Sequence, residues 1–335
     1  MLRPLVSVAM ITYNHESYIR KAIECVLAQK TDFPFELVIG EDFSTDGTRE
    51  IVLDYAARYG DKIRLVTSES NVGMHKNCYR TEQACEGKYI AYCEGDDYWQ
   101  RDDKLQLQTD YMEKHPDCGL VFSDYNWYFT QSGRLIEGFL KFYDSNILHS
   151  PRIEDIVAKR VDIRTCTVMA RRNLVEQIKK ADPLLHFNGH FRMADIQVWA
   201  EISLVSEIHY IDESLATYQI LEESATQSRL RLSGLHFSIS DSEMYLYLCN
   251  KYKLSPDLRS RYENIWRRST LQLAFFEKNR ELAEAARKHY PDLSLKDWIW
   301  YLGTRYTLFR PVVIVFRHLQ KHTVEKGLEA YVFRK

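Results

Sequence analysis

The 335-residue chain lacks an excess of charge of either sign, since 45 basic side chains are balanced by 47 acidic ones and the net charge is -2. Such a chain has no bulk attraction for polyanions, which argues against a nucleic-acid-binding protein. Its 13 glycines and 8 prolines form no Gly-rich or Pro-rich tract. We therefore expect no long flexible linker.

Paired metal-binding cysteines are also missing. The 7 cysteines are an odd number and include no CxxC pair or other zinc-ligand spacing. This pattern predicts free thiols in a reduced, cytoplasmic compartment. The N-terminal apolar stretch is too short for a secretory signal, and polar Thr12 and Asn14 follow it at once, so we interpret it as a first strand.

Short apolar runs alternate with helical patterns in the first half of the chain, which is typical of a mostly parallel α/β sheet with crossover helices. Helices are predicted over residues 16–29, 46–59 and 195–204. The strand runs are near-continuously apolar, as strands buried on both faces should be. The predicted strands are residues 5–12, 36–41, 63–67, 89–93 and 119–123, with a further strand at 165–170.

After about residue 228 the apolar spacing is helical and no strand pattern recurs, with Pro256 and Pro291 as breaks. The chain is also longer than one core usually requires. We therefore predict two units, an α/β domain over residues 1–225 and a helical region over residues 226–335.

Polar side chains follow the predicted strands where each strand ends. In open α/β sheets ligands bind beyond the carboxyl ends of the strands, so these side chains are the candidates for a site. Several carboxylates gathered there repel one another unless a cation or hydrogen-bond donors offset the repulsion. The candidates are Thr12, Tyr13 and Asn14 after the first strand, Glu41 and Asp42 after the second, and Glu94, Asp96 and Asp97 after the fourth.

Glu94 and Asp96 are two positions apart, which places both carboxylates on the same side of an extended segment. They can share Mn²⁺ or Mg²⁺, which prefer oxygen ligands and are commonly completed by substrate phosphates. A solvated acidic turn is the alternative, and the nearby Asp42 favours the metal. Asp42 could accept hydrogen bonds from a ribose hydroxyl or a base N–H, or cap the next helix, although Asp46 is the better cap.

Four segments of the chain resemble, in order and spacing, the successive motifs of family 2 glycosyltransferases, which have the GT-A fold. They are VSVAMITYNHESYIRKAIECVLAQ, ELVIGEDFSTDGT, NVGMHKN and GKYIAYCEGDDYW. The resemblance covers roughly the first 225 residues and implies a nucleotide-sugar-binding catalytic domain. It implies that Thr12, Tyr13 and Asp42 hold the nucleoside and that Lys76 lies near it or near the diphosphate. Asp96 would bind the metal as the last residue of a DxD-type motif.

The remaining strand-end residues complete the predicted site. Asn14, Glu41 and Asp97 are predicted to bind the donor, and Glu94 is predicted to bind the metal. Glu41 and Glu94 stand where the family more often has Asp, so a contact of Glu94 with the metal could pass through water. The later segment MADIQVW resembles the family's acidic motif and implies that Asp195 is the catalytic base. A single displacement needs such a carboxylate near the acceptor hydroxyl. The alternative is that Asp195 caps the following helix.

The C-terminal tail is rich in aromatic and basic side chains. Arg305 and Arg310 exclude a comfortable transmembrane helix within residues 298–317, and residues 296–335 carry eight Lys or Arg against three acidic side chains. The tail is either an interfacial segment attracted to anionic lipid or a helix packed on the protein with its basic side in water. Peripheral attachment to the inner face of the cytoplasmic membrane would suit a lipid-linked acceptor.

Together these features predict an inverting glycosyltransferase that moves a sugar from a nucleotide diphosphate donor to a hydroxyl of a saccharide or lipid-linked acceptor. The resemblance implies a UDP-sugar donor and a role in bacterial surface polysaccharide or glycolipid assembly. One alternative is a nucleotide-sugar-binding module without turnover. Another is a sugar nucleotidyltransferase, although the glycine-rich N-terminal loop of that class is missing.

Overall fold

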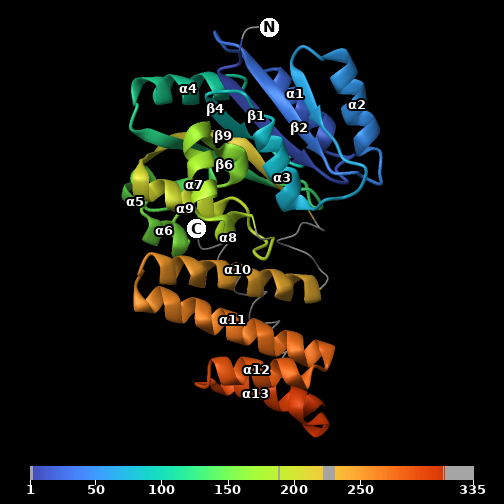
Figure 1. The fold of residues 1–335 in the computed structure, drawn as a ribbon, viewed down its shortest axis with the longest axis vertical. Helices are drawn as coiled ribbons and strands as arrows, with labels where there is room; N and C mark the ends of the chain where they lie inside the picture. Colours follow the sequence, from blue (N-terminus) through green and yellow to red (C-terminus); the bar gives the residue numbers. More distant parts are fainter. Residues whose placement is uncertain (1–2, 188, 222–230, 312, 314–335) are drawn as a thin grey trace. The chain divides into compact units, whose positions relative to one another are not determined.

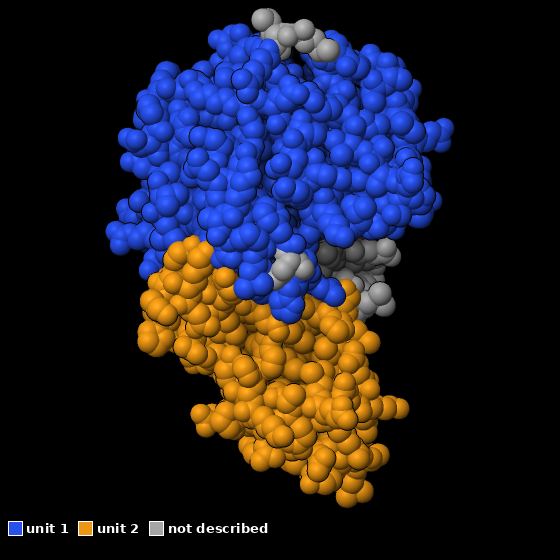
Figure 2. Space-filling view, in the orientation of Figure 1, with its two compact units in different colours: residues 1–222 blue, residues 223–335 orange. Residues whose placement is uncertain are grey.

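A computed structural model of the chain describes residues 3–187, 189–221, 231–311 and 313. The chain divides into two compact units, residues 1–222 and residues 223–335, which are coloured blue and orange in Figure 2. The first unit is built on a single sheet and the second is helical (Figure 1).

The first half of the sheet is parallel, as predicted. It contains β1 (Val6–Thr12), β2 (Phe35–Glu41), β3 (Ile63–Val66) and β4 (Tyr89–Tyr92) in the order β3-β2-β1-β4. All three pairings between these strands are parallel. Apolar side chains on β1, β2 and β4 are buried, which agrees with strands covered on both faces.

The second half of the sheet is mixed. β8 (Met169–Arg171) is antiparallel to β4 on one side and to β6 (Cys118–Phe129) on the other. β6 then pairs in parallel with β9 (Glu207–Ile220), with bulges in the register, and β9 pairs with the antiparallel β5 (Tyr98–Trp99). β7 (Arg134–Ile136) is antiparallel to β6. Among the described residues β8, β5 and β7 run against the other six strands, so the sheet as a whole is mixed, with its parallel part at β3-β2-β1-β4.

The predicted strand at residues 165–170 is partly wrong. Residues Thr165–Thr167 form a 3₁₀ turn, η2, and only the short reversed β8 follows. The sequence pattern also missed β9, because the polar run Asp212, Glu213 and Ser214 interrupts its apolar alternation. This strand is stabilised by pairing with β6, whose residues are about 90 positions away in the chain.

Helices cover the sheet (Figure 1). The predicted helices appear as α1 (Ile19–Leu27), α2 (Thr48–Arg58) and α9 (Ile196–Val205). The N-cap of α2 is Gly47 rather than the predicted Asp46, although the Asp46 Oδ1 accepts the N–H of Thr48, the first residue of the helix, at 3.0 Å. The other helices of this unit are α3 (Met74–Gln83), α4 (Lys104–Lys114), η1 (Phe139–Phe142), α5 (Ser145–His149), α6 (Ile153–Val157), α7 (Arg172–Ala181) and α8 (Pro183–His186).

The second unit is helical, with α10 (Arg231–Lys251), α11 (Pro256–Glu277), α12 (Arg280–His289), α13 (Leu295–Arg305) and η3 (Thr307–Phe309). Pro256 occupies the first turn of α11, where its missing N–H is tolerated, and Ser255 caps that helix. Leu271, Phe275 and Trp300 lie in a buried core between α11, α12 and α13.

Among the described residues, none of the helices combines the length and apolarity that crossing a bilayer requires. Of the predicted C-terminal tail, residues 312 and 314–335 lie outside the described residues.

Candidate functional site

The ends of β1, β2 and β4 meet at one edge of the sheet. The Asp42 N–H donates to the carbonyl of Thr12 at 3.1 Å, and the Gly95 N–H donates to the carbonyl of Ile11 at 3.0 Å. A Cβ on Gly95 would lie 2.7 Å from Thr12 Oγ1, so the two segments are in close contact. Thr12 Oγ1 is buried and has no hydrogen-bond partner among the described residues. The structure therefore brings together the strand-end residues that the sequence selected.

Asp96 is partly accessible, with a quarter of its side chain exposed. His15 Nε2 lies 3.9 Å from Asp96 Oδ2, and His15 Nδ1 is buried without a partner among the described residues. His15 was not among the site residues predicted from the sequence. Its position directly after the predicted donor residues Tyr13 and Asn14 was the one available signal.

Glu94 is half-buried beside Asp96, and one of its carboxyl oxygens is fully covered. Burial, and then the negative charges of Asp96 and Asp195, together raise the pKa of its carboxyl to about 8. Its Oε2 is buried and accepts no hydrogen bond from the described residues. Glu94 is thus a carboxyl group close to two others, with one oxygen left unsatisfied.

Asp97 points into the protein, with 3 % of its surface exposed. Burial, and then the charges of Asp96 and Glu94, raise its pKa well above the usual range. Its Oδ1 accepts the backbone N–H of Gln219 at 2.8 Å, and the Gln219 side-chain amide donates to the carbonyl of Asp96. Asp97 therefore ties the acidic segment to β9.

The Asp42 carboxylate is buried and holds the loop before α3. Its two oxygens accept the backbone N–H groups of Val72 and Gly73, each at 2.9 Å. Arg80 Nη2 lies 3.6 Å from Asp42 Oδ1 and donates to the carbonyl of Glu41 at 2.7 Å. Each carboxylate oxygen can accept a second hydrogen bond, so these contacts leave capacity for a ligand.

Glu41 is completely buried and its charge is paired. Arg49 Nη1 lies 3.1 Å from Glu41 Oε2, and the Ser44 N–H donates to Oε1 at 2.6 Å. Asn14 also stabilises the loop after β2, because its Oδ1 accepts the Thr45 N–H at 2.8 Å. Its backbone is in the left-handed region, with a φ of 55°. Arg49 and Arg80 hold the segment that contains Glu41 and Asp42, and neither was predicted from the sequence.

Tyr13 and Lys76 have accessible side chains. Tyr13 is 41 % exposed, and Lys76 is exposed on the first turn of α3. Both are therefore free of the interior packing that surrounds Glu41 and Asp42.

Asp195 precedes α9 and has both oxygens in use. Its Oδ1 accepts the N–H of Ile196 at 2.7 Å, so the expected capping contact is present. Its Oδ2 accepts a hydrogen bond from Thr165 Oγ1 at 2.6 Å. Its negative charge contributes to the raised pKa of Glu94, which puts Asp195 near the acidic segment.

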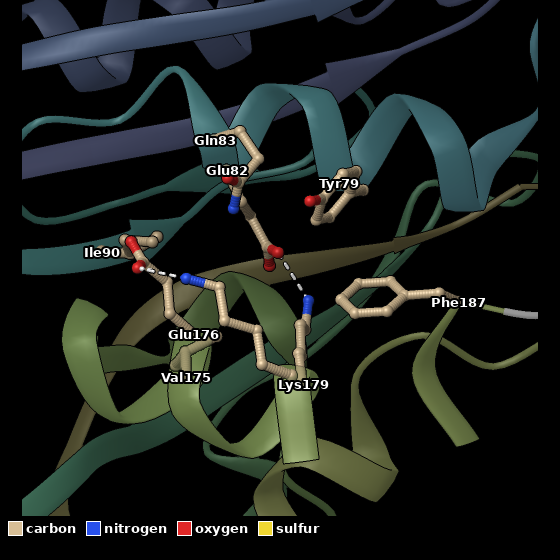
Figure 3. Close-up of a pocket in the computed structure, with 9 residues that line it drawn as sticks. Tyr79, Glu82, Gln83, Ile90, Val175, Glu176, Lys179 and Phe187 are labelled. Atoms are coloured by element: carbon tan, nitrogen blue, oxygen red, sulfur yellow. Dashed lines mark hydrogen bonds and ion pairs between the residues drawn. The ribbon is translucent and has the colours of Figure 1, made fainter. Parts of the chain in front are cut away.

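A small pocket lies between α3 and α7, lined in part by Tyr79, Glu82, Lys179 and Phe187 (Figure 3). Lys179 Nζ lies 2.5 Å from Glu82 Oε2, and both side chains are buried. Burial disfavours the charged amine, but the charge and hydrogen bond of Glu82, together with the effects of Cys78 and Asp195, outweigh it, so the pKa of Lys179 is raised. Asp195 also contributes to this shift, which places the pair close to the site.

The acidic segment suits a hard divalent cation. Glu94 has an unsatisfied buried oxygen, Asp96 has an accessible carboxylate, and oxygen is the ligand atom that Mg²⁺ and Mn²⁺ prefer. Within the described parts of the chain, no group of three or more His, Cys, Asp or Glu side chains is arranged to hold a metal. The protein would supply part of a coordination sphere, as is common where substrate phosphates supply the rest.

Comparisons with known sequences point to one family. Residues 7–178 match the model of a family described as glycosyl transferase family 2. An uncharacterized protein of Mycobacterium tuberculosis is 43% identical over 116 residues, which cover 35% of this chain and 34% of that protein. The match thus spans about a third of the length of this relative. TuaG of Bacillus subtilis, named as a teichuronic acid biosynthesis glycosyltransferase, is 29% identical over 230 residues, covering 68% of this chain and 83% of TuaG.

Two solved structures share the fold. TarS of S. aureus, in complex with UDP-GlcNAc, has a TM-score of 0.54 and 17% identity, covering 89% of this chain and 79% of that chain. The mannosyltransferase PcManGT of Pyrobaculum calidifontis, in complex with GDP-Man and Mn²⁺, has a TM-score of 0.56 and 15% identity. The match covers 97% of this chain and 87% of that chain. These similarities confirm the predicted GT-A fold with a helical C-terminal region.

Proposed function

Because the chain belongs to glycosyl transferase family 2, we propose that it transfers a sugar, with inversion, from a UDP-sugar to a hydroxyl group of an acceptor. The observation that carries this proposal is that three separate segments, those of Asp42, Asp96 and Asp195, adjoin near the end of β1. Backbone hydrogen bonds from Asp42 to Thr12 and from Gly95 to Ile11 hold the first two segments against β1, and the charges of Asp96 and Asp195 both act on Glu94.

On the donor side, Thr12 and Asp42 hold the nucleoside through an unsatisfied hydroxyl and the spare acceptor capacity of a carboxylate. Tyr13 and Lys76 contact the donor from accessible positions, Lys76 near the diphosphate. The other proposed donor residues, Asn14, Glu41 and Asp97, contribute through the backbone that their hydrogen bonds fix around the site.

Asp96 and Glu94 are the residues that would hold Mn²⁺ or Mg²⁺. A cation bound there supplies positive charge that neutralises the departing diphosphate. Asp195 acts as general base and takes the proton of the acceptor hydroxyl as its oxygen bonds to C1 of the sugar and the C1–O bond to the diphosphate breaks. This single displacement accounts for inversion.

We propose a saccharide or lipid-linked acceptor, in surface polysaccharide or glycolipid assembly. The similarity to TuaG, which is named for teichuronic acid biosynthesis, supports this proposal. A cytoplasmic protein that meets the inner face of the membrane would suit such an acceptor. The second unit presents exposed apolar side chains next to basic ones: Leu295 is 79% and Leu308 89% exposed, and Arg305 and Arg310 are close in the chain.

Thermal unfolding with a panel of donors tests the catalytic proposal. UDP-GlcNAc, UDP-glucose and GDP-mannose are compared with and without Mn²⁺, since a ligand of the native state raises the melting temperature. Asp96→Asn should abolish the metal-dependent part of the shift. Asp195→Asn should retain donor binding but lose both transfer and donor hydrolysis. Full turnover of Asp195→Asn would contradict the assignment of the base.

Two outcomes would replace the proposal. Donor and metal binding without transfer or hydrolysis with any acceptor would identify a nucleotide-sugar-binding module. Pyrophosphate release from a nucleoside triphosphate and a sugar phosphate would identify a nucleotidyltransferase.

Membrane attachment is tested separately by sedimentation with phosphatidylcholine vesicles, with and without phosphatidylglycerol. The protein should sediment with the anionic vesicles, and Leu308→Glu should weaken this. Equal sedimentation with both kinds of vesicle would contradict the electrostatic attachment.

A further inference from the structure

The 3₁₀ turn η2 contacts the carboxylates of two other segments. Thr165 donates to Asp195, and the neighbouring Cys166 lies close enough to Asp97 to oppose the rise of the Asp97 pKa that burial causes. The turn is itself anchored, because the Cys166 carbonyl accepts the indole N–H of Trp99 at 2.9 Å. A short turn from the middle of the chain therefore adjoins both the proposed base and the acidic segment.

The hydroxyl of Thr165 holds one oxygen of the Asp195 carboxylate. It donates to Asp195 Oδ2 at 2.6 Å. The other oxygen of Asp195 is held by the Ile196 N–H at 2.7 Å. Because each oxygen accepts one hydrogen bond, the Asp195 carboxylate keeps both bonds in only one orientation of its plane.

We propose that Thr165 is a positioning residue for the transfer reaction, whose hydroxyl holds the Asp195 carboxylate in the orientation that accepts the proton of the acceptor. This inference rests on the proposed function, in which Asp195 is the base. The Ile196 N–H alone leaves the carboxylate free to rotate about its Cβ–Cγ bond. Misplacement of a reacting group by about 1 Å costs on the order of a hundredfold in rate.

Three substitutions separate positioning from folding. Thr165→Val removes the hydroxyl at nearly constant volume, and Thr165→Ser retains it. Thr167→Val is the matched control in the same turn, because the Thr167 hydroxyl donates to the carbonyl of Arg164 at 2.7 Å rather than to a carboxylate. All are compared by UDP release from UDP-GlcNAc with Mn²⁺, or GDP release from GDP-mannose, and by calorimetric titration with UDP and Mn²⁺.

Thr165→Val should lower kcat by about tenfold to a hundredfold while the Kd for UDP changes by less than about twofold. Thr165→Ser should recover most of kcat, and Thr167→Val should keep it. The inference is overturned by unchanged kcat in Thr165→Val, by failure of Thr165→Ser to restore kcat, or by an equal loss in Thr167→Val.

The double variant Thr165→Val with Asp195→Asn tests the positioning role of Thr165 separately from the role of Asp195 as the base. If Thr165 acts through Asp195, the double variant should be no slower than Asp195→Asn alone, because residues that act as a unit are non-additive. Inactive Asp195→Asn with fully active Thr165→Val would sink this inference and leave the proposed function standing. Fully active Asp195→Asn would remove both.

Discussion

Lys179 Nζ lies 2.5 Å from Glu82 Oε2 and links α7 to α3 across 97 positions of the chain (Figure 3). The other oxygen of Glu82 accepts the Tyr92 hydroxyl hydrogen at 3.1 Å, which adds β4 to the network. Because the pair is buried, Lys179→Met leaves the Glu82 charge without a cation.

We expect Lys179→Met to lower the free energy of unfolding by about 3–5 kcal/mol, measured by urea denaturation. The double variant Lys179→Met with Glu82→Gln serves as the control and should be less destabilised, since the buried charge is removed with its partner. Equal stability of wild type and Lys179→Met would show that the pair contributes nothing net.

Gly95 separates Glu94 from Asp96 at a point where no side chain fits. A Cβ there would lie 2.7 Å from Thr12 Oγ1 and 2.9 Å from Ile19 Cδ1, and both neighbours are buried. Gly95→Ala should cost about 1–3 kcal/mol of stability and weaken UDP binding, because Thr12 must move. Thermal melting and calorimetric titration measure the two effects. Gly60→Ala is the comparison, where the nearest atom is 3.3 Å away, and a similar effect at both positions would contradict the packing argument.

Lys104 is a buried amine whose stability contribution depends on pH. Burial lowers its pKa from 10.5 to about 7, while Gln108 Oε1 accepts a hydrogen bond from its Nζ at 2.7 Å. Between these two values the unfolded chain holds a proton that the folded chain does not, so stability rises with pH from about 7 toward 10.

Lys104→Met removes this titration. The stability of the wild type relative to Lys104→Met should rise by up to about 1.4 kcal/mol per pH unit between pH 7 and 9, measured by urea denaturation at each pH. Parallel pH profiles for the two proteins would mean that Lys104 remains charged in the folded state.

Asp297 is buried in the helical unit and connects the start of α13 to α11. Arg267 Nη2 lies 3.0 Å from its Oδ2, and Ser294 Oγ donates to the same oxygen at 2.6 Å, where the two residues form a capping box at the start of α13. Asp297→Ala should destabilise the second unit by about 3 kcal/mol or more, because it leaves a buried guanidinium unpaired and removes a cap. The change is measured by thermal melting, and Arg268→Ala, which alters a half-exposed side chain 3.5 Å from Asp297, should cost far less.

The parallel half of the sheet and its polar strand ends could be predicted because their signals are local. Strands buried on both faces need continuous apolar runs, and the residues after β1, β2 and β4 change abruptly to polar types. The contact of Asp46 with the start of α2 was equally readable, although the N-cap itself is Gly47, because such a residue and its helix are neighbours in the chain. The roles proposed for the strand-end residues stay predictions.

The supporting residues could not be predicted, because each contact joins segments far apart. Thr165 reaches Asp195 over 30 positions, and Asp97 reaches the Gln219 N–H over 122. The strand β9 has polar residues in its middle and exists through pairing with β6.

The amino-acid sequence by itself determined the parallel strands β1 to β4, the acidic groups at their ends and the helical second unit, because apolar periodicity acts within a few residues. The tertiary structure alone decided which carboxylate faces solvent, which is buried and which donor each one meets. Burial, hydrogen bonding and like-charge repulsion depend on distances that only the folded chain defines. That is why Asp96 and Asp97, neighbours in the chain, have opposite surroundings.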